Sequence, residues 1–576
     1  MEIIFKVLKL SLSFIYPLVL CFSFYYIYKN KNYNKVIKNN YMKIIKNTII
    51  VFLIITIGCI LFFFIEDTIY RYDYAGHWNR ILFIRTEISN PFDILRYVYD
   101  TMNNSDYSSL SALFQIGFTF INKSYGFFVY GIFMLYYIPT FILLNILYYK
   151  YFDKYKYLPV LIALLFYPLY ITILFGIVDI SGFVFLILGI MAVILPKYED
   201  VQLKDYLMLN VLIFIMIFLR RWYLYPAVTI YICVLIKHIC YHKKNLFNKD
   251  ILKLFASGLP LLITILLFFR PYLLNVISND FKSAYAFYDR GGKILGLIDF
   301  FSILYMIVIS FGLYKCLRHS KDYLNIVLFL LMTVVPLLLF WNTQSLEYHH
   351  YYMVTFTFIV LFTIGIYHLV SIKYLKIGLV AASFVQLCVI FSPLEKTTPF
   401  FTTVRKIPEV LSYKDDLVAI TSFLKNNCKN DYIYMATGNY SFNDDMLKNA
   451  LLPEQSGLQF VHATLDARDG FPNNIEHIKY IVVTNPQLYL AEPEHQIMYK
   501  VISEAITSNK LFDGYYEEIH FDELVYKTTN PVQMNYVGVY VYKQLKPLTD
   551  AHLQHFYDEI IKYYPSESEK YSHIID

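Results

Sequence analysis

Three charged side chains at the ends of hydrophobic stretches are the residues best placed to do chemistry: Asp73, Arg220 and Arg221. Asp73 lies in the segment RYDYAGHW (71–78), just after the second hydrophobic stretch, and Glu66 and Asp67 precede it. Ionisable groups at a membrane boundary are costly to desolvate, so a cluster of them is a candidate functional site. Two adjacent guanidinium groups suit bidentate binding of a phosphate or diphosphate. The alternatives are a solvated loop for Asp73 and lipid-headgroup anchoring for the arginines.

The turn 342–350 is dense in hydrogen-bonding groups, among them Glu347, His349 and His350. Carboxylate, amide and imidazole groups suit recognition of sugar hydroxyls, and interfacial anchoring is the alternative. Metal binding by the two histidines is not expected, because adjacent residues on a helix point about 100° apart and no third ligand is evident. This turn is therefore a candidate substrate-binding segment.

Two further charged residues have both a structural and a functional interpretation. Asp179 stands alone in a very apolar segment, where it either caps the helix that follows or lines a site. Arg290 lies in the loop 271–296 beside a pair of glycines. That loop either closes over an anionic group or is simply flexible and solvated.

The composition is that of an integral membrane protein. Of the 576 residues, 57% are hydrophobic and only 16% are charged, which is too apolar for a soluble enzyme of this length. Apolar stretches of about 17–25 residues recur, each long enough to cross the hydrocarbon core as a helix. We predict a polytopic α-helical protein with about 11–13 spans. The predicted spans lie near 5–28, 44–65, 124–149, 157–175, 178–195, 206–219, 222–240, 252–270, 297–315, 323–341, 351–371 and 376–392.

Every second loop between these stretches is rich in lysine and arginine, which predicts that this set faces the cytoplasm. The opposite set then faces outward: 66–123, 176–179, 220–221, 271–296, 342–350 and the tail after Pro393. Lys6 and Lys9 conflict with this pattern, since they precede a first span that would start outside. The outward loop 66–123 is amphipathic, which predicts helices that lie in the headgroup plane or form a lid on the bundle.

The tail differs from the rest of the chain in charge. Residues 394–576 hold 16 basic and 25 acidic residues, which leaves 34 and 19 for residues 1–393. The membrane part is therefore basic (+15) and the tail acidic (−9). We predict a transmembrane module over 1–393 and an extracytoplasmic α/β domain over 394–576. Its expected elements are helices at 415–426, 494–507 and 549–563 and strands at 432–436, 479–484, 517–521 and 537–542.

The order of these features resembles the GT-C superfamily of membrane glycosyltransferases. The match consists of the motif YDYAGH (72–77) in the first large outward loop, the amphipathic region 80–100 after it, and the outward tail. The chain is most similar to the protein O-mannosyltransferase and aminoarabinose-transferase branch. These enzymes take a sugar from a polyprenyl-phosphate carrier on the outer face of the membrane. Many relatives have paired acidic residues in this motif, whereas Asp73 has no adjacent carboxylate, so we expect a metal-independent reaction.

The resemblance implies an inverting sugar transfer in which Asp73 acts as general base or orients the acceptor. It implies that the leaving phosphate is held by the arginines, Arg220, Arg221 and Arg290. The residues expected to contact substrate are Asp179, Glu347, His349, His350, Tyr74 and His77. The expected partners are a polyprenyl-phosphate-linked sugar, a cell-envelope glycan, lipid or protein acceptor, and membrane lipids, with no cofactor and no nucleic acid. The expected location is the plasma membrane, with the C-terminal domain extracellular.

Three other functions fit parts of the same pattern. A glycan polymerase or ligase acting on lipid-linked oligosaccharides would share the outward loops and the arginines. A transporter or flippase would suit about twelve spans, although internal repeats and charges inside the spans, which are typical of carriers, are scarce here. A non-catalytic surface-binding or anchoring protein would keep its function without Asp73. We also expect the α/β tail to have a binding or positioning role, since it has no glycine-rich phosphate loop.

Overall fold

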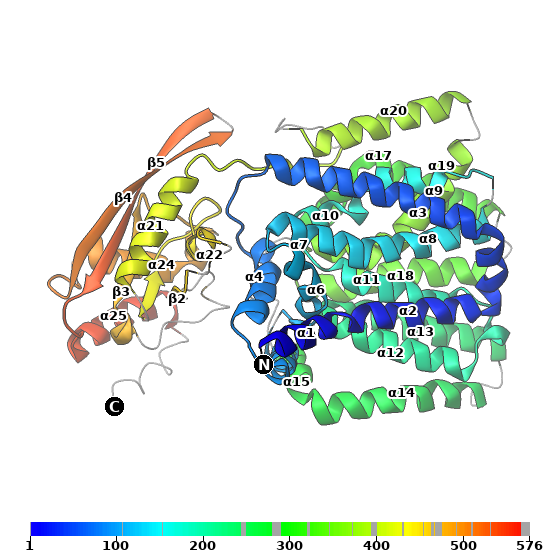
Figure 1. Cartoon of the computed structure of the whole chain (residues 1–576), viewed down its shortest axis with the longest axis horizontal. Coiled ribbons are helices and arrows are strands. Elements are labelled where there is room, and N and C mark those ends of the chain that lie inside the picture. The colour runs from blue at the N-terminus through cyan, green and yellow to red at the C-terminus, as the bar shows by residue number, and fades with distance from the viewer. Residues whose placement is uncertain are drawn as a thin grey trace. The chain divides into compact units, whose positions relative to one another are not determined.

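The chain folds into two compact units, each described here by itself (Figure 1). The first unit comprises Met1–Ile65 and Gly76–Pro408, and the second comprises Glu66–Ala75 and Glu409–Asp576. This computed structural model describes all residues except 1, 106, 153, 244–248, 279–289, 320–322, 345, 371–372, 393–399, 429–430, 453, 455, 462–465, 467–474, 491, 509–510, 530–531 and 566–576. The second unit is therefore discontinuous in sequence, because ten residues that follow the second hydrophobic helix belong with the tail.

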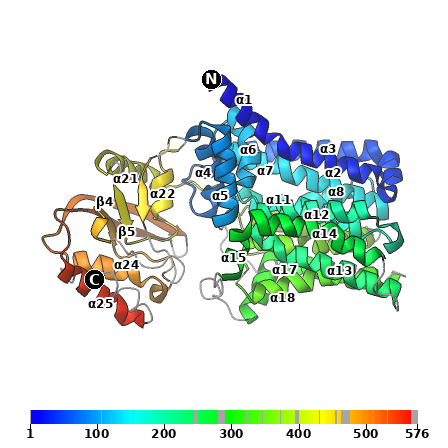
Figure 2. The same cartoon turned by 90° about the horizontal axis from the view of Figure 1, so that it is seen from below.

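The first unit is a bundle of helices, many of them running side by side (Figures 1 and 2). Its N-terminal helices are α1 (Glu2–Ser13), α2 (Ile15–Lys29), α3 (Lys31–Ile65), α4 (Asp73–Thr86), α5 (Pro91–Asn104), α6 (Leu110–Ile121), α7 (Tyr125–Ile132), α8 (Ile138–Tyr151), α9 (Leu158–Leu165) and α10 (Ile171–Leu174). They are followed by α11 (Ile180–Gly189), α12 (Leu203–Leu219), α13 (Leu224–His242), α14 (Lys249–Phe268), α15 (Arg270–Ser278), α17 (Arg290–His319), α18 (Tyr323–Trp341), α19 (Tyr352–Leu369) and α20 (Lys373–Ile390).

Within the described residues, eight helices are long and apolar enough to cross a membrane. They are Phe5–Lys29, Lys31–Ile65, Tyr125–Tyr151, Arg221–His242, Lys249–Phe268, Ile294–His319, Tyr323–Trp341 and Tyr348–Leu369. The predicted span 157–175 is not one long helix, because α9 ends at Leu165 and only short turns and α10 follow. Phe166 leaves the helical region (φ −81°, ψ 71°) and Pro168 has no N–H to donate, so the helix cannot continue there.

Three of the lysine-rich turns lie near one another in the bundle. Lys31 forms an ion pair with Asp200 at 2.5 Å, which joins the α2–α3 turn to the turn before α12. The side chain of Asn47 donates to the carbonyl of Lys156 at 3.1 Å, which brings the α8–α9 turn to α3. These contacts agree with the predicted alternation of basic and non-basic loops, which placed all three turns in one set.

The conflict raised by Lys9 has a local structural reason. Its ammonium group donates to the carbonyls of Ile84 and Arg85, at 3.3 and 3.0 Å, in the last turn of α4. The last carbonyls of a helix have no partner within the helix and carry partial negative charge, so they are good acceptors for a cation. Lys9 therefore satisfies the end of an amphipathic helix, a role that the charge pattern of loops does not include.

Two glycines allow α17 and α19 to pack backbone against backbone. A Cβ added to Gly312 would come within 1.9 Å of the carbonyl oxygen of Leu361, and one added to Gly365 within 2.4 Å of that of Val308. Small residues let membrane helices approach closely, where dispersion contacts and weak backbone hydrogen bonds stabilise the pair. The contact positions α19, which begins next to the histidine turn 348–351.

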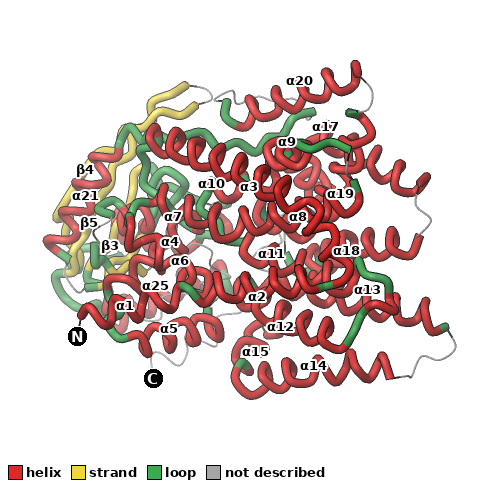
Figure 3. The backbone as a smooth tube through the Cα atoms, turned by 45° about the vertical axis from the view of Figure 1, so that its right-hand side comes forward, coloured by secondary structure: helices red, strands yellow, loops and turns green. Residues whose placement is uncertain are grey.

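The second unit contains a five-stranded sheet in the order β2-β1-β3-β5-β4, and Figure 3 shows its strands in yellow. The strands are β1 (Tyr432–Met435), β2 (Gln459–Val461), β3 (Tyr480–Asn485), β4 (Tyr516–Thr529) and β5 (Val532–Gln544). β2, β1 and β3 are parallel, and β5 runs antiparallel to both β3 and β4. Helices α21 (Lys414–Asn427) and α22 (Asp444–Asn449) pack on one face, and α24 (Ile497–Thr507) and α25 (Asp550–Tyr563) on the other. The unit is a three-layer α/β/α domain.

The predicted elements of the tail all have counterparts, and all but one start within three residues of the prediction. The exception is β5, which begins at Val532, five residues early, so that β4 and β5 form a hairpin longer than expected. The sequence analysis missed α22 and β2, which are six and three residues long. Elements this short have too few positions to show a periodic pattern.

We predict that Gly312→Val destabilises the first unit, because the added carbons would force apart the backbones of α17 and α19. Overpacking of this kind costs about 1–3 kcal/mol or more. Thermal unfolding of the purified protein in detergent would measure the loss. Gly58→Val is the control, since a Cβ at Gly58 meets nothing within 4 Å. Equal transition temperatures for the two variants would contradict the close contact.

Candidate functional site

The segment that carries Asp73 is anchored in the second unit. Asp67 and Val410 form a parallel bridge, in which Asp67 N donates to Glu409 O and Leu411 N donates to Asp67 O, both at 2.9 Å. Ile69 is only 3% exposed and belongs to the hydrophobic core under α21. Residues 66–75 therefore follow the surface of the α/β domain and contribute one side chain to its interior.

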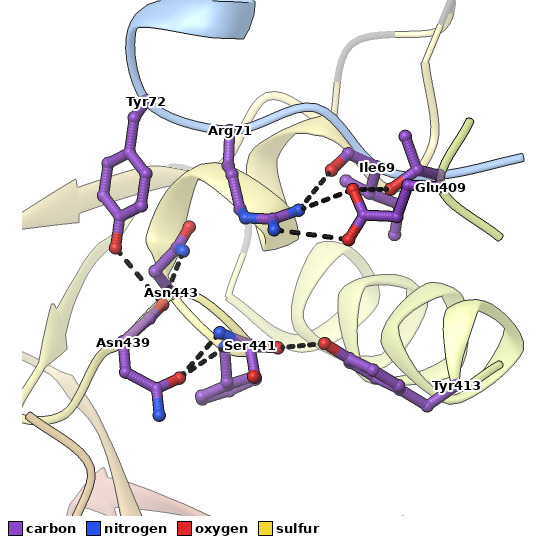
Figure 4. Close-up of polar contacts among 10 residues, drawn as sticks. Ile69, Arg71, Tyr72, Glu409, Tyr413, Asn439, Ser441 and Asn443 are labelled. Atoms are coloured by element: carbon purple, nitrogen blue, oxygen red, sulfur yellow. Dashed lines mark hydrogen bonds and ion pairs between the residues drawn. The ribbon is translucent and has the colours of Figure 1, made fainter. Parts of the chain in front are cut away.

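Two side chains that follow Ile69 reinforce this anchor (Figure 4). The guanidinium of Arg71 donates to both carboxylate oxygens of Glu409, each at 3.3 Å. The hydroxyl of Tyr72 donates to the carbonyl of Asn439 at 3.2 Å, and its backbone N–H donates to Asp445 at 2.9 Å. Burial, and to a smaller extent the negative charge of neighbouring groups, raises the pKa of Tyr72, so its hydroxyl remains a donor.

The loop whose Asn439 carbonyl accepts from Tyr72 is itself held by hydrogen bonds. The side chain of Asn439 accepts from the backbone N–H groups of Ser441 and Phe442, at 2.8 and 3.0 Å, and Tyr413 donates to the carbonyl of Ser441 at 2.8 Å (Figure 4). Tyr72 itself has φ +52°, a conformation uncommon for residues other than glycine. Such strain persists where surrounding contacts over-determine the backbone, as the hydrogen bonds of Tyr72 do here.

Asp73 is the first residue of α4 and is half-buried. A carboxylate in the first turn interacts favourably with the N-terminal end of a helix. Of the acidic residues predicted to surround it, Glu66 accepts from Tyr70 at 2.7 Å and Asp67 pairs with Lys414. Tyr74 is half-buried beside it. The polar boundary seen in the sequence is thus a set of contacts within the α/β domain.

A second polar assembly lies inside the first unit, and we call it the arginine–histidine cluster. Its members are His77, Arg80, Tyr107, Asp179, Arg220, Arg221, Trp222, His349 and His350. They come from α4, from the loop before α6, from the turn before α11, from the end of α12, and from the short helices Arg221–Tyr223 and Tyr348–Tyr351. Asp179, Arg220, Arg221, Trp222, His349 and His350 all lie in the connections between long helices.

A buried ion pair is the centre of this cluster. Arg220 Nε donates to Asp179 Oδ1 at 2.8 Å, and the two side chains are 7% and 0% exposed. Trp222 Nε1 donates to the same oxygen at 2.6 Å, and the hydroxyl of Tyr223 donates to the carbonyl of Asp179 at 2.7 Å. Asp179 makes no side-chain capping bond to α11. Of its two predicted roles, the structural evidence therefore opposes the helix cap.

The ring of Tyr107 contacts two guanidinium groups. The Cζ atoms of Arg220 and Arg80 are 4.9 and 5.3 Å from its centroid, and the imidazole of His77 is 5.9 Å away. A cation over an aromatic face is stabilised by the ring quadrupole. Tyr107 thus holds two arginines near each other that would otherwise repel.

The histidine turn completes the cluster. The rings of His349 and His350 are 4.0 Å apart, and His350 is 5.8 Å from Trp222. The backbone N–H of Glu347 donates to Nδ1 of His350 at 3.0 Å, which leaves the proton of a neutral His350 on Nε2. The side chain of Glu347 itself is exposed. The structure therefore brings both predicted histidines to the arginines.

The electrostatics of the cluster favour an anion. Burial, followed by the positive charges of Arg220 and Arg80, holds the pKa of His77 well below its ordinary value, so His77 is neutral near pH 7. His77 is 2% exposed, and in the part of the chain that the structure describes its Nδ1 atom and the Oδ2 atom of Asp179 make no hydrogen bond. Three arginines near one buried carboxylate give a positive potential, and the open nitrogen offers a polar contact to a bound group.

The predicted site residues other than Glu347, whose side chain is exposed, thus fall into three sets. His77, Asp179, Arg220, Arg221, His349 and His350 are brought together in the first unit. Asp73 and Tyr74 belong to the segment anchored in the second unit. The side chain of Arg290 lies outside the described residues. Arg80, Tyr107 and Trp222 were missed, although Trp222 follows the arginine pair directly in sequence.

Among the described residues, no group of three or more His, Cys, Asp or Glu side chains is arranged to hold a metal ion. Independence from metal stays a prediction. No protein-family model matches the chain, and a search of curated proteins finds no significant relative.

We predict that Ile69→Ala releases the segment 66–75 from the α/β domain. Truncating a buried isoleucine costs about 2–5 kcal/mol, so the open population should rise about tenfold or more. Trypsin cleavage after Arg71, followed by mass spectrometry of the full-length protein, would report this opening. Asp67→Asn is the control, since that side chain is exposed. Unchanged cleavage in Ile69→Ala would show that the segment is not anchored by this contact.

We also predict that Asp179→Asn destabilises the first unit by about 3–5 kcal/mol, because it leaves Arg220 buried without its counter-charge. The double variant Asp179→Leu/Arg220→Met should lose less, since it removes both charges. Thermal unfolding in detergent would compare them. Asp250→Asn, which breaks a more exposed pair with Lys253, is the matched control. A double variant less stable than Asp179→Asn would contradict the assignment.

Proposed function

We propose that this protein is an integral membrane glycosyltransferase that moves a sugar from a polyprenyl-phosphate donor to a cell-envelope acceptor. The proposed reaction is inverting and independent of metal. The observation that carries the proposal is the arginine–histidine cluster, a buried, positively charged assembly within a bundle of membrane-length helices. The proposed setting is the plasma membrane, with about 11–13 spans and the α/β domain outside the cell.

The cluster supports the donor half of this proposal. The donor presents a phosphate at the membrane boundary, and this phosphate gains negative charge when the sugar leaves. Arg221 and Arg80 are the guanidinium groups that would hold it, beside Arg220, which pairs with Asp179. Preorganised charges aimed at a developing anion are often the largest single contribution to catalysis. His77 would donate or accept a hydrogen bond through its open nitrogen.

The acceptor half rests on Asp73. Its proposed role is to take the proton of the acceptor hydroxyl as that oxygen attacks the anomeric carbon. The bond between that carbon and the donor phosphate breaks in the same step, and the lipid phosphate leaves with the bonding electrons. General-base help of this kind is worth about 10²–10⁴ in rate.

A surface-glycan mass profile would test the reaction. Cells would carry the wild type, a deletion, or Asp73→Asn at matched protein level. A sugar missing from both the deletion and Asp73→Asn would identify the transferred group. A sugar missing only from the deletion would remove Asp73 from the chemistry, and shortened chains of unchanged composition would favour a polymerase or ligase. No change in any strain would overturn the proposal.

Donor binding can be measured separately, with undecaprenyl monophosphate as the probe. Native mass spectrometry of the full-length protein in nanodiscs would count the bound lipid. We expect Arg221→Ala to weaken binding about tenfold or more, since a charge-assisted contact to phosphate is lost, whereas Asp73→Asn should bind normally. Arg318→Ala is the control, because Arg318 is an exposed arginine in the last turn of α17. Equal binding by Arg221→Ala and Arg318→Ala would contradict the proposed phosphate site.

A further inference from the structure

The α/β domain contains a cleft of about 360 Å³ between the sheet and α24. One wall is formed by Val483 of β3 and by Tyr540 and Tyr542 of β5, and the facing wall by α24. Residues 484–489, which end β3 and follow it, close one side. The cleft lies entirely within the second unit, so it is independent of the arginine–histidine cluster.

The wall of the cleft that α24 forms is polar. Lys500, Ser503, Glu504 and Thr507 line it, and their spacing of three, four and seven residues places them on one face of α24. The opposite stripe, which includes Met498, Val501 and Ile502, is buried in the core. A helix that only covered a sheet would fill the sheet-facing positions with apolar residues. The second, polar stripe therefore leaves a space lined by hydrogen-bonding groups.

The sheet wall presents aromatic faces. A Cβ added to Gly538 would come within 2.9 Å of the Tyr540 ring, so only glycine lets this ring lie against the strand. The Tyr540 ring also packs on Phe521 of β4, with centroids 4.8 Å apart. Burial raises the pKa of Tyr542, which keeps its hydroxyl protonated as a donor. The wall offers flat apolar surface edged by hydroxyl groups.

Gln487 provides a polar group that lacks a partner. Its Nε2 atom donates to the carbonyl of Ala436 at 2.6 Å, which fixes the orientation of the amide. Its Oε1 atom is buried and accepts no hydrogen bond from any residue described in the structure. A buried acceptor that is left without a hydrogen bond costs free energy. That oxygen is closed off from solvent, so it lies behind the surface of the cleft, to which Gln487 contributes other atoms.

The position of the cleft also fits a binding site. It lies at the carboxyl end of β3, and its lining continues onto β5, the antiparallel neighbour of β3. In open α/β sheets, ligands bind outside the carboxyl ends of the strands.

We propose that this cleft binds a neutral, polyhydroxylated ligand, a segment of a glycan. The charged residues of the cleft, Lys500 and Glu504, are of opposite sign, so the cleft has no excess charge to hold an anion. The other polar groups are hydroxyls and amides, which can both donate and accept. The tyrosine faces match the apolar faces of sugar rings. The proposal stands without the proposed transferase activity, since every residue in it belongs to the α/β domain.

Binding of a panel of fluorescently labelled hexasaccharides would test the proposal: maltohexaose, cellohexaose, chitohexaose and mannohexaose. The full-length protein in nanodiscs would be titrated with each. We expect saturable binding of at least one, weakened about tenfold or more by Tyr540→Ala, because truncating a central aromatic contact has effects of this size. Glu504→Gln should also weaken binding, and it does not disturb the aromatic wall.

Tyr536→Ala is the matched control. Tyr536 lies on the same face of β5, but it is outside the cleft and mostly exposed. This variant, and Arg221→Ala of the cluster, should bind the hexasaccharide as the wild type does. No binding of any of the four sugars, or binding unchanged in both Tyr540→Ala and Glu504→Gln, would overturn the glycan cleft. If Arg221→Ala loses donor-lipid binding but still binds the hexasaccharide, the phosphate site and the glycan cleft are separate sites.

Discussion

The buried pair of Asp179 and Arg220 is the interaction on which the arginine–histidine cluster depends. A lone charge at either position would be costly in so apolar a setting, and Trp222 adds a second hydrogen bond to the oxygen that Arg220 contacts. The pair fixes the end of α12 against the start of α11. It also presents Arg220 to Tyr107, which in turn contacts Arg80. One ion pair therefore organises the positive potential of the whole cluster.

The candidate site could be predicted from sequence to the extent that its members are polar residues in apolar surroundings. Arg220, His349 and Asp179 were found in this way, because a charge or an imidazole is conspicuous between membrane-length helices. Tyr107 was not found, since a tyrosine is one of 57 in the chain and carries no signal of its own. Its role comes from contacts with two arginines that lie 27 and 113 positions away. Contacts between residues so far apart in sequence cannot be inferred from the spacing of residue types.

In the fold, too, features that depend on neighbouring residues could be predicted, and features that depend on distant residues could not. Long apolar stretches and the alternation in 432–436 and 479–484 predicted helices and strands correctly, because their periods are local. The break after Leu165 depends on one proline and on packing, so hydropathy alone passed over it. The assignment of residues 66–75 to the α/β domain depends on Glu409 and Asn439, more than three hundred positions away. No pattern within the segment could have indicated it.

The discontinuous second unit has a consequence for the order of biosynthesis. Residues 66–75 are made long before their partners, since the next residue of the α/β domain is Glu409. At about 5–20 residues per second, the ribosome needs about 20–70 s to reach it. During that interval the segment with Ile69 and Tyr72 has no binding surface. The domain can close only when the last third of the chain has emerged, so assembly of the Asp73 segment is among the final events of folding.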